Sequence, residues 1–237
     1  MKGGEAVIKA LEKEGVSYIS GFAGGGLAPL WPGMRESDSI KVFATRHERL
    51  GVEVADGYAR ATGNVGVAMT GTGPGATNTL TGVAACYADN IPVLLLMGQH
   101  PLRNLGKEYQ QEVSSSIFDT VVKWKGTFNR VDEIPGIMRR AFTALRSESP
   151  GPVVLEMPQD VLQAEAEDIV LNYQPVGPGR KPAPDRQDID KAAQLLVEAN
   201  FPILNVGGGA LGGDAAPEVL ELAELLSLPL ASTLVGK

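Results

Sequence analysis

The run from Ile91 to Met97 is apolar throughout and is followed by Gly98. A strand with one solvent-exposed face would alternate apolar and polar residues, so this run predicts a parallel strand covered on both faces. Similar short segments alternate with helical patterns along the chain and predict strands at 18–22, 40–44, 65–70, 121–124 and 152–156. The alternation predicts an α/β fold with an open, mostly parallel sheet and helices on both faces.

Helices are predicted between these strands, at 4–14, 48–61, 76–88 and 132–145. In the helix that starts at Glu48, the spacing of Leu50, Val54, Tyr58 and Ala61 predicts an inward-facing stripe. Asp132 is predicted as the N-cap of the helix that follows it. A further short helical segment after Gly24-Gly25-Gly26 is expected to end at Pro32-Gly33.

The composition changes after Pro158, and residues 174–184 are too rich in proline and glycine for regular structure. We predict a first domain at 1–170, a linker at 171–184 and the start of a Rossmann-like central domain at 185–237. The last segment is expected to be truncated, because two strands and two helices cannot cover their own sheet faces.

Charge and cysteine content exclude several classes of protein. With 21 basic and 28 acidic residues the net charge is −7, which argues against a nucleic-acid partner. The sequence contains no apolar run long enough for a membrane span and no signal-peptide core, so a cytoplasmic protein is expected. Its single cysteine, Cys86, excludes an internal disulfide and is interpreted as a small buried apolar residue.

Two junctions between strands and helices carry the candidate site, because open parallel sheets bind ligands where strands end. At the first junction, the strand at 40–44 continues through Thr45-Arg46-His47 into a helix that starts with Glu48. At the second, the strand at 65–70 continues into Gly71-Thr72-Gly73-Pro74-Gly75-Ala76-Thr77-Asn78. A carboxylate at one edge of a crevice and bare glycine backbone at the other suit a flat heteroaromatic cofactor.

The segment from Gly71 to Ala76 also matches the dinucleotide fingerprint G-x-G-x-x-A, between a strand and a helix. A nicotinamide dinucleotide would also need an acidic residue at the end of the next strand, to bind the ribose. That strand ends in Met97-Gly98-Gln99-His100, without an acid. The sequence therefore argues against NAD and favours another ligand that approaches the backbone closely.

With Asp56-Gly57-Tyr58-Ala59-Arg60 after Glu48 and Thr81-Gly82-Val83-Ala84 after Asn78, the chain resembles the pyrimidine-binding domain of thiamine-diphosphate enzymes. The resemblance is closest to the acetolactate synthase family. It implies that Glu48 hydrogen-bonds a ring nitrogen of the aminopyrimidine and activates the cofactor. It further implies that the pyrimidine end is lined by Gly73, Pro74, Gly75 and Asn78.

A third candidate comes from the same resemblance. The family carries an aromatic-Gln-Glu triplet whose glutamine directs its amide at the reacting carbonyl, where it stabilises negative charge without titrating. The corresponding residues here are Tyr109-Gln110-Gln111, with tyrosine in place of the usual phenylalanine and Gln111 in place of the glutamate. Gln110 is the preferred match, and a shift by one residue would make Gln111 the match instead.

The chain has two histidines, which excludes a histidine-based metal cluster. His47 is interpreted as a packing and hydrogen-bonding neighbour of Glu48, with a direct role in proton transfer as the alternative. His100 stands where the family usually has a small apolar residue. It is expected at the surface, and the alternative is a place along the substrate path.

The family's diphosphate and metal site, Gly-Asp-Gly followed further on by Asn-Asn, has no match in the sequence. The most similar stretch is Gly212-Gly213-Asp214-Ala215, in which Asp214 is interpreted as a helix N-cap. The ligands of Mg²⁺ are therefore expected outside these residues, and the 237-residue chain alone is expected to be inactive.

For the full-length protein the resemblance implies decarboxylation of a 2-oxo acid such as pyruvate and transfer of the two-carbon fragment to a second carbonyl, as in branched-chain amino acid biosynthesis. It implies a homodimer or tetramer, because in the family the cofactor lies between two subunits. FAD and a small regulatory subunit are further candidates. The alternatives are another thiamine-diphosphate decarboxylase, acetyltransferase or hydrolase, and a non-catalytic module that pairs with a second polypeptide.

Overall fold

The computed structural model describes residues 1–22, 24–107, 112–147, 149–166, 172–177 and 183–236. Its contacts divide the chain into two compact units, Met1–Gly179 and Arg180–Lys237. Each unit is considered by itself below. Among the described residues, no helix is both long enough and apolar enough to cross a membrane.

The first unit is built on one six-stranded sheet with the order β2-β1-β3-β4-β6-β5. All neighbouring strands in it are parallel. The strands are β1 (Tyr18–Gly21), β2 (Lys41–Ala44), β3 (Gly66–Thr70), β4 (Val93–Gln99), β5 (Trp124–Thr127) and β6 (Val153–Pro158). Every residue of β3, β4 and β6 is buried, as expected for parallel strands between two layers of helices.

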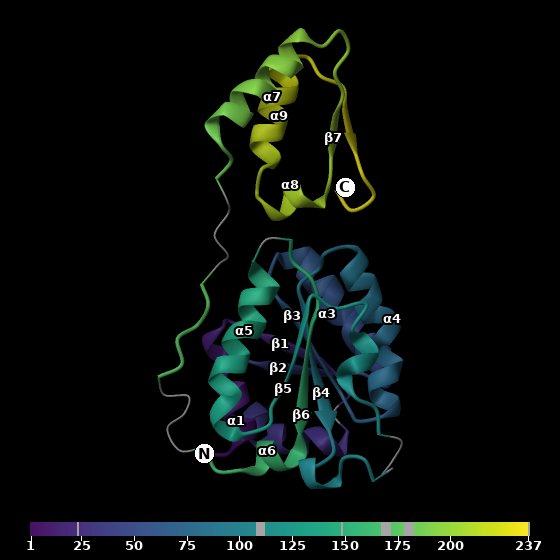
Figure 1. Ribbon diagram of the computed structural model, residues 1–237, viewed down its shortest axis with the longest axis vertical. Helices are drawn as coiled ribbons and strands as arrows, with labels where there is room; N and C mark the ends of the chain where they lie inside the picture. The colour runs from purple at the N-terminus through teal and green to yellow at the C-terminus, as the bar shows by residue number, and fades with distance from the viewer. Residues whose placement is uncertain (23, 108–111, 148, 167–171, 178–182, 237) are drawn as a thin grey trace. The chain divides into compact units, whose positions relative to one another are not determined.

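Helices cover both faces of this sheet, which confirms the predicted α/β architecture (Figure 1). Figure 1 shows α1 and α5 on one face and α3 and α4 on the other. The α-helices are α1 (Gly3–Lys13), α2 (Trp31–Glu36), α3 (Glu48–Thr62), α4 (Pro74–Ala88), α5 (Ile134–Arg146) and α6 (Gln159–Gln163). Short 3₁₀ turns lie at η1 (Gly25–Leu30), η2 (Leu102–Asn104), η3 (Ser115–Phe118) and η4 (Val131–Glu133).

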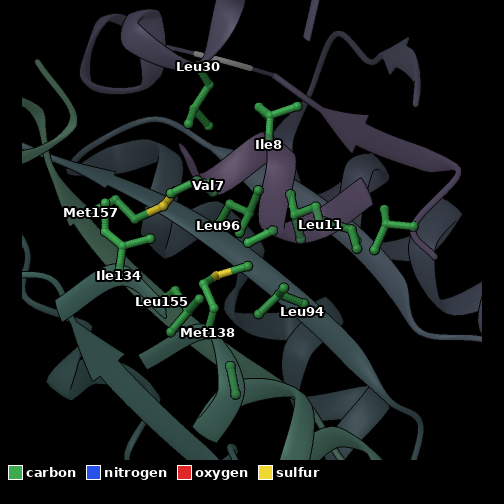
Figure 2. Packing of buried hydrophobic residues seen from close by; sticks show 14 of the residues in the cluster. Val7, Ile8, Leu11, Leu30, Leu94, Leu96, Ile134, Met138, Leu155 and Met157 are labelled. Carbon is green, nitrogen blue, oxygen red and sulfur yellow. The ribbon is translucent and has the colours of Figure 1, made fainter. Parts of the chain in front are cut away.

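The larger part of the core lies between the sheet and α1 and α5. Figure 2 shows side chains of these helices packed on β4 and β6: Val7, Ile8, Leu11, Ile134 and Met138 against Leu94, Leu96, Leu155 and Met157. A smaller cluster on the other face packs α3 and α4 on the same strands. The two clusters together cover both faces of the central strands of the sheet.

Three predictions of local structure are wrong. Pro32 does not end the helical segment but lies in the first turn of α2, where it needs no hydrogen-bond donor. The strand predicted at 121–124 begins only at Trp124, because the N–H of Val121 still closes a turn on Phe118 O at 2.8 Å. Asp132 does not cap α5, because its carboxylate pairs with Arg130 at 2.5 Å, which lowers the pKa of that carboxyl group.

The predicted inner face of α3 is also wrong. Leu50 is 49% exposed and Val54 is 41% exposed. The helix instead buries its smaller residues, which are Gly51, Val52, Ala55 and Ala59. The reason is the closeness of α3 to the sheet, which leaves no room for longer side chains on the inner face.

Backbone contacts show how close α3 lies to the sheet. A Cβ atom on Gly51 would lie 2.5 Å from the Cα of Gly21 in β1. A Cβ atom on Gly66 in β3 would lie 2.1 Å from the carbonyl oxygen of Ala55. Real Cβ atoms do not approach other atoms so closely, so both contacts require glycine. The position of α3, and of Glu48 at its start, is therefore set by backbone contact.

The second unit contains two parallel strands, β7 (Leu204–Val206) and β8 (Leu230–Ser232), and three helices, α7 (Arg186–Glu198), α8 (Gly208–Gly212) and α9 (Ala216–Leu225). Asp185 caps α7 by accepting a hydrogen bond of 2.7 Å from Gln187 N. The prediction that Asp214 is an N-cap is wrong. Ala215 holds that position, and Asp214 takes a left-handed conformation with φ 53° after α8.

Candidate active site

The site lies where the connections in the sheet reverse direction. From β1 the chain continues to β2 on one side, whereas β3 lies on the other side of β1. In open α/β sheets such a switch point opens a crevice at the carboxyl ends of the strands. The turns after β1 and β3 meet there, since a Cβ atom on Gly24 would lie 3.0 Å from the Cα of Gly71.

Glu48 is the first residue of α3, directly above the end of β2, and is half-buried. Its backbone is fixed by the residues before it. Thr45 Oγ1 donates to the carbonyl oxygen of His47 at 2.9 Å, and His47 Nδ1 accepts from the N–H of Arg49 at 3.2 Å. His47 is therefore the N-cap of α3, which agrees with its interpretation as a hydrogen-bonding neighbour of Glu48.

Asn78 brings the second junction to the first. It lies just over one turn into α4, and its Nδ2 donates a hydrogen bond of 3.0 Å to Glu48 Oε2. Asn78 thus orients the carboxylate of Glu48, although the two residues are 30 positions apart in the sequence. Asn78 itself is exposed at the surface of the described chain.

The turn before α4 leaves space beside this carboxylate. Gly73 caps the helix with a φ of 55°, which favours glycine, and Pro74 takes the first helical position. A Cβ atom on Gly75 would lie 3.0 Å from Thr70 Oγ1 and 3.4 Å from Glu48 Oε1. The absence of a side chain at Gly75 therefore leaves a narrow space between a hydroxyl group and a carboxylate, which a methyl group would already crowd.

Thr70 was not among the residues identified from the sequence. Its Oγ1 atom is buried and has no hydrogen-bond partner among the described residues. An unpaired buried hydroxyl is costly, and in a native protein it commonly marks a place for a ligand or a water molecule. The signal in the sequence was a threonine at the last position of a buried strand, directly before the glycine-rich turn.

This set of residues fits the pyrimidine end of thiamine diphosphate. It offers a carboxylate, a neighbouring hydroxyl group and bare glycine backbone, which a flat nitrogen heterocycle can approach closely. It offers nothing for a metal, since the described part of the chain holds no group of three or more His, Cys, Asp or Glu side chains placed to bind one.

The two candidate substrate-facing residues, Gln110 and Gln111, lie outside the described residues. The described chain on either side is joined by a hydrogen bond of 2.7 Å from Gly106 N to Glu112 Oε2.

His100 is not at the surface, which corrects the prediction from the sequence. It is only 6% exposed, and its backbone N–H donates to Gln99 Oε1 at 2.9 Å. The reason is that β4 stays paired with β6 up to Gln99, so the next residue is still covered by the sheet edge. Cys86 is fully buried, as predicted, and burial raises the pKa of its thiol to about 12.

Known proteins match this chain in sequence. Residues 1–118 match the family model of the thiamine pyrophosphate enzymes' N-terminal thiamine-pyrophosphate-binding domain. The whole chain is 40% identical to the probable acetolactate synthase large subunit of Methanocaldococcus jannaschii, of which it covers 41%. It is 37% identical, again over its whole length, to the glyoxylate carboligase of Escherichia coli O157:H7, of which it covers 40%.

A solved structure shares the fold. The thiamine diphosphate-dependent 4-hydroxybenzoylformate decarboxylase of Rhodococcus jostii RHA1 superposes with a TM-score of 0.90 over 98% of this chain and 44% of its own, at 21% identity. The chain thus spans about two fifths of the length of the curated relatives named above. The family model and the relatives match the segments that carry Glu48, the glycine-rich turn and Asn78. Residues 1–118 therefore belong to the N-terminal binding domain of the thiamine pyrophosphate enzymes.

Proposed function

We propose that the full-length protein is a thiamine-diphosphate-dependent enzyme that decarboxylates a 2-oxo acid and transfers the remaining fragment to a second carbonyl, as acetolactate synthases do. The observation that carries the proposal is the carboxylate of Glu48, which is held by Asn78 beside the space at Gly75. The similarity to acetolactate synthases and to a glyoxylate carboligase supports carboligation as the second half of the reaction.

Thiamine diphosphate supplies the carbon nucleophile and the electron sink for such a reaction. The residues of this chain would bind and activate its pyrimidine end. Glu48 would share a proton with a ring nitrogen, Asn78 would hold the Glu48 carboxylate in place, and Gly73, Pro74 and Gly75 would bring backbone against the ring. Gln110, or Gln111 in the alternative alignment, would direct an amide at the substrate carbonyl.

Several parts of the proposal concern the whole protein. The Mg²⁺ and diphosphate ligands would come from residues outside this chain, so the 237 residues alone would be inactive. A homodimer or tetramer would complete each site, and FAD and a small regulatory subunit are further candidates. A cytoplasmic location and a role in branched-chain amino acid biosynthesis would follow from an acetolactate synthase activity.

The test is Glu48→Gln in the full-length protein. Glutamine keeps the size of the side chain and its hydrogen bond with Asn78 but cannot share the proton. We expect the exchange of the C2 hydrogen of bound cofactor for deuterium to slow by roughly 10² to 10⁴-fold, the usual contribution of a positioned acid–base group. Cofactor affinity should fall only slightly, because the diphosphate contributes most of it. Exchange at the wild-type rate in Glu48→Gln would refute the proposal.

A second candidate function is the simple decarboxylation of a 2-oxo acid, with hydrolase or acetyltransferase activity as variants. The structural similarity to a decarboxylase is the observation that favours it. Product analysis with pyruvate as substrate separates the two functions, because carboligation gives a five-carbon hydroxy-oxo acid and decarboxylation gives acetaldehyde.

A further inference from the structure

A buried acid at the carboxyl end of β6 has no role in the site described above. Glu156 lies in a strand whose other residues are all apolar, and it is 7% exposed. Placing a carboxylate in such a position is unfavourable unless hydrogen bonds compensate for the lost water. No lysine or arginine in the described parts of the chain forms an ion pair with it.

Neutral donors surround the carboxylate instead. Glu156 Oε1 accepts from Gln99 Nε2 at 2.7 Å. Oε2 accepts from Ser115 Oγ at 2.6 Å, from Thr127 Oγ1 at 3.2 Å and from Ser115 N at 3.4 Å. The carboxylate therefore joins the end of β4, the end of β5 and the start of η3 at one point.

The partners of Glu156 enclose one segment of the chain. Gln99 is the last residue of β4, and besides Glu156 its Nε2 donates to the carbonyl oxygen of Val113 at 2.9 Å. Its Oε1 accepts from His100 N at 2.9 Å. Residues 99–100 and residues 113–115, the two ends of the segment between β4 and η3, are thus tied together through Gln99 and Glu156.

The same cluster adjoins the crevice. A Cβ atom on Gly26, in the glycine-rich turn after β1, would lie 3.3 Å from the backbone nitrogen of Gln99 and 2.9 Å from Thr72 Cγ2. The backbone of Gln99 therefore lies against Gly26, which in turn lies against Thr72 in the turn after β3. A change in the position of Gln99 would therefore reach the crevice through Gly26.

We propose that Glu156 is a positioning residue for the proposed reaction. Its carboxylate fixes both ends of the segment 99–115, and through them the side of the crevice where the substrate carbonyl is to react. This inference rests on the proposed function for its catalytic consequence, but the positional part stands on the hydrogen bonds alone. Gln110 belongs to the enclosed segment by sequence.

The main test compares Glu156→Gln with Thr127→Val in the full-length protein. The glutamine amide directs its NH₂ group either at Gln99 Nε2 or at Ser115 N, and both are donors, so one hydrogen bond to a charged group is lost even where a hydroxyl of Ser115 or Thr127 turns to accept from the amide. Thr127→Val removes a hydroxyl contact on the β5 side and leaves both ties intact. Ser115→Ala, which deletes one donor without changing the buried acid, serves as a second variant with little risk to folding.

The first readout is backbone hydrogen–deuterium exchange in peptides covering 99–107 and 112–118. We expect exchange to accelerate about tenfold or more in Glu156→Gln and Ser115→Ala, as loss of a hydrogen bond to a charged group implies. In Thr127→Val it should stay within about twofold of wild type. Unchanged exchange in both Glu156→Gln and Ser115→Ala would overturn the proposal.

The second readout separates positioning from general destabilisation. In Glu156→Gln, first-turnover decarboxylation at saturating 2-oxo acid should slow about tenfold or more, whereas C2 hydrogen exchange of bound cofactor should stay near wild type. Equal slowing of both steps would mean that the role is only structural. If the wild-type enzyme decarboxylates no 2-oxo acid, the proposed function fails, and the peptide exchange still decides whether Glu156 fixes the segment.

Discussion

Asn78 and Glu48 are joined by a hydrogen bond of 3.0 Å between two helices that each begin at the end of a parallel strand. The bond limits the rotamers of the Glu48 side chain, since its other carboxylate oxygen lies beside the space at Gly75. If Glu48 is to hydrogen-bond one ring nitrogen of a ligand, this restriction favours binding. The side chain then loses less conformational freedom when the ligand binds.

Removal of the Asn78 side chain should therefore slow activation of the cofactor without unfolding the protein. In full-length Asn78→Ala we expect C2 hydrogen exchange of bound thiamine diphosphate to slow about tenfold, the effect of losing one hydrogen bond to a charged group. Stability should change by less than about 0.5 kcal/mol, because Asn78 is exposed. Thr77→Ala, which removes an exposed hydroxyl on the preceding residue, is the control and should exchange as wild type does.

A side chain at Gly75 should interfere with ligand binding more than with folding. Its Cβ atom would lie 3.0 Å from Thr70 Oγ1 and 3.4 Å from Glu48 Oε1, which is tight but tolerable before a ligand binds. For Gly75→Val we expect a loss of at least about tenfold in thiamine-diphosphate affinity by calorimetry and a destabilisation of about 1–3 kcal/mol. Gly57→Val is the matched control, because Gly57 is also helical and faces open space.

The same calorimetry should show no binding of NAD to the wild-type protein. β4 ends at Gln99 and offers no acid for the ribose, and Pro74 removes one amide from the turn before α4. Micromolar affinity for NAD that is lost in Gly75→Val would instead support a dinucleotide site at this turn.

Alkaline pH should destabilise the first unit through Cys86. Its thiol has a folded pKa of about 12, raised from 9.0 by burial and by the nearby Asp56. Between these values the unfolded chain releases the proton and the folded chain keeps it, so the free energy of unfolding falls as pH rises from about 9 to about 12. Denaturation at stepwise pH should show this slope, and Cys86→Ala should reduce it.

Tyr173 provides a control for that experiment. Burial and a hydrogen bond to Glu14 also raise the pKa of its phenol, so part of the alkaline slope belongs to it. Tyr173→Phe should therefore retain the contribution of Cys86. If Cys86→Ala leaves the slope of the wild type unchanged, the thiol is not the titrating group.

Arg146 should be needed for the stability of the first unit. It pairs at 2.5 Å with Glu14, whose side chain is fully buried and also accepts from Tyr173 Oη at 2.5 Å and from Val176 N at 2.8 Å. Arg146→Ala leaves this acid without its cation, which typically costs about 3–5 kcal/mol. Urea denaturation followed by tryptophan fluorescence measures it, because both tryptophans lie in the first unit.

The control for this prediction is Arg35→Ala. Arg35 meets Glu36 at 4.0 Å with both side chains largely exposed, so its removal should cost less than about 1 kcal/mol. Equal stability of Arg146→Ala and Arg35→Ala would show that the buried pair is dispensable.

The sequence predicts the parallel sheet and the place of Glu48 well because both depend on local patterns. Fully apolar strands and the change of period from strand to helix are visible without tertiary information. The inner face of α3 was predicted wrongly because leucine and valine normally mark the buried side of a helix. Here the closest approach of helix and sheet at Gly51 excludes them, and no local pattern records that distance.

In the candidate site, too, local motifs were predictable from the sequence and tertiary contacts were not. Glu48, Asn78 and the glycine-rich turn were recognisable as motifs, whereas Thr70 and the cluster at Glu156 depend on contacts between distant segments. The sequence did contain one indication of the cluster at Glu156. An acid inside the apolar run of β6 is unfavourable unless hydrogen-bond partners surround it. The burial of His100 was not predictable, because it follows from how far β4 pairs with β6.

The glycine contacts beneath α3 have a consequence for how this protein tolerates mutation. Gly51 in α3 and Gly66 in β3 have no role in the proposed chemistry, yet each lets the helix that bears Glu48 rest on the sheet backbone. A single added methyl group at either of them would lift the helix and carry the acid away from Asn78. Selection for the chemistry of one glutamate thus acts on residues that have no chemistry of their own.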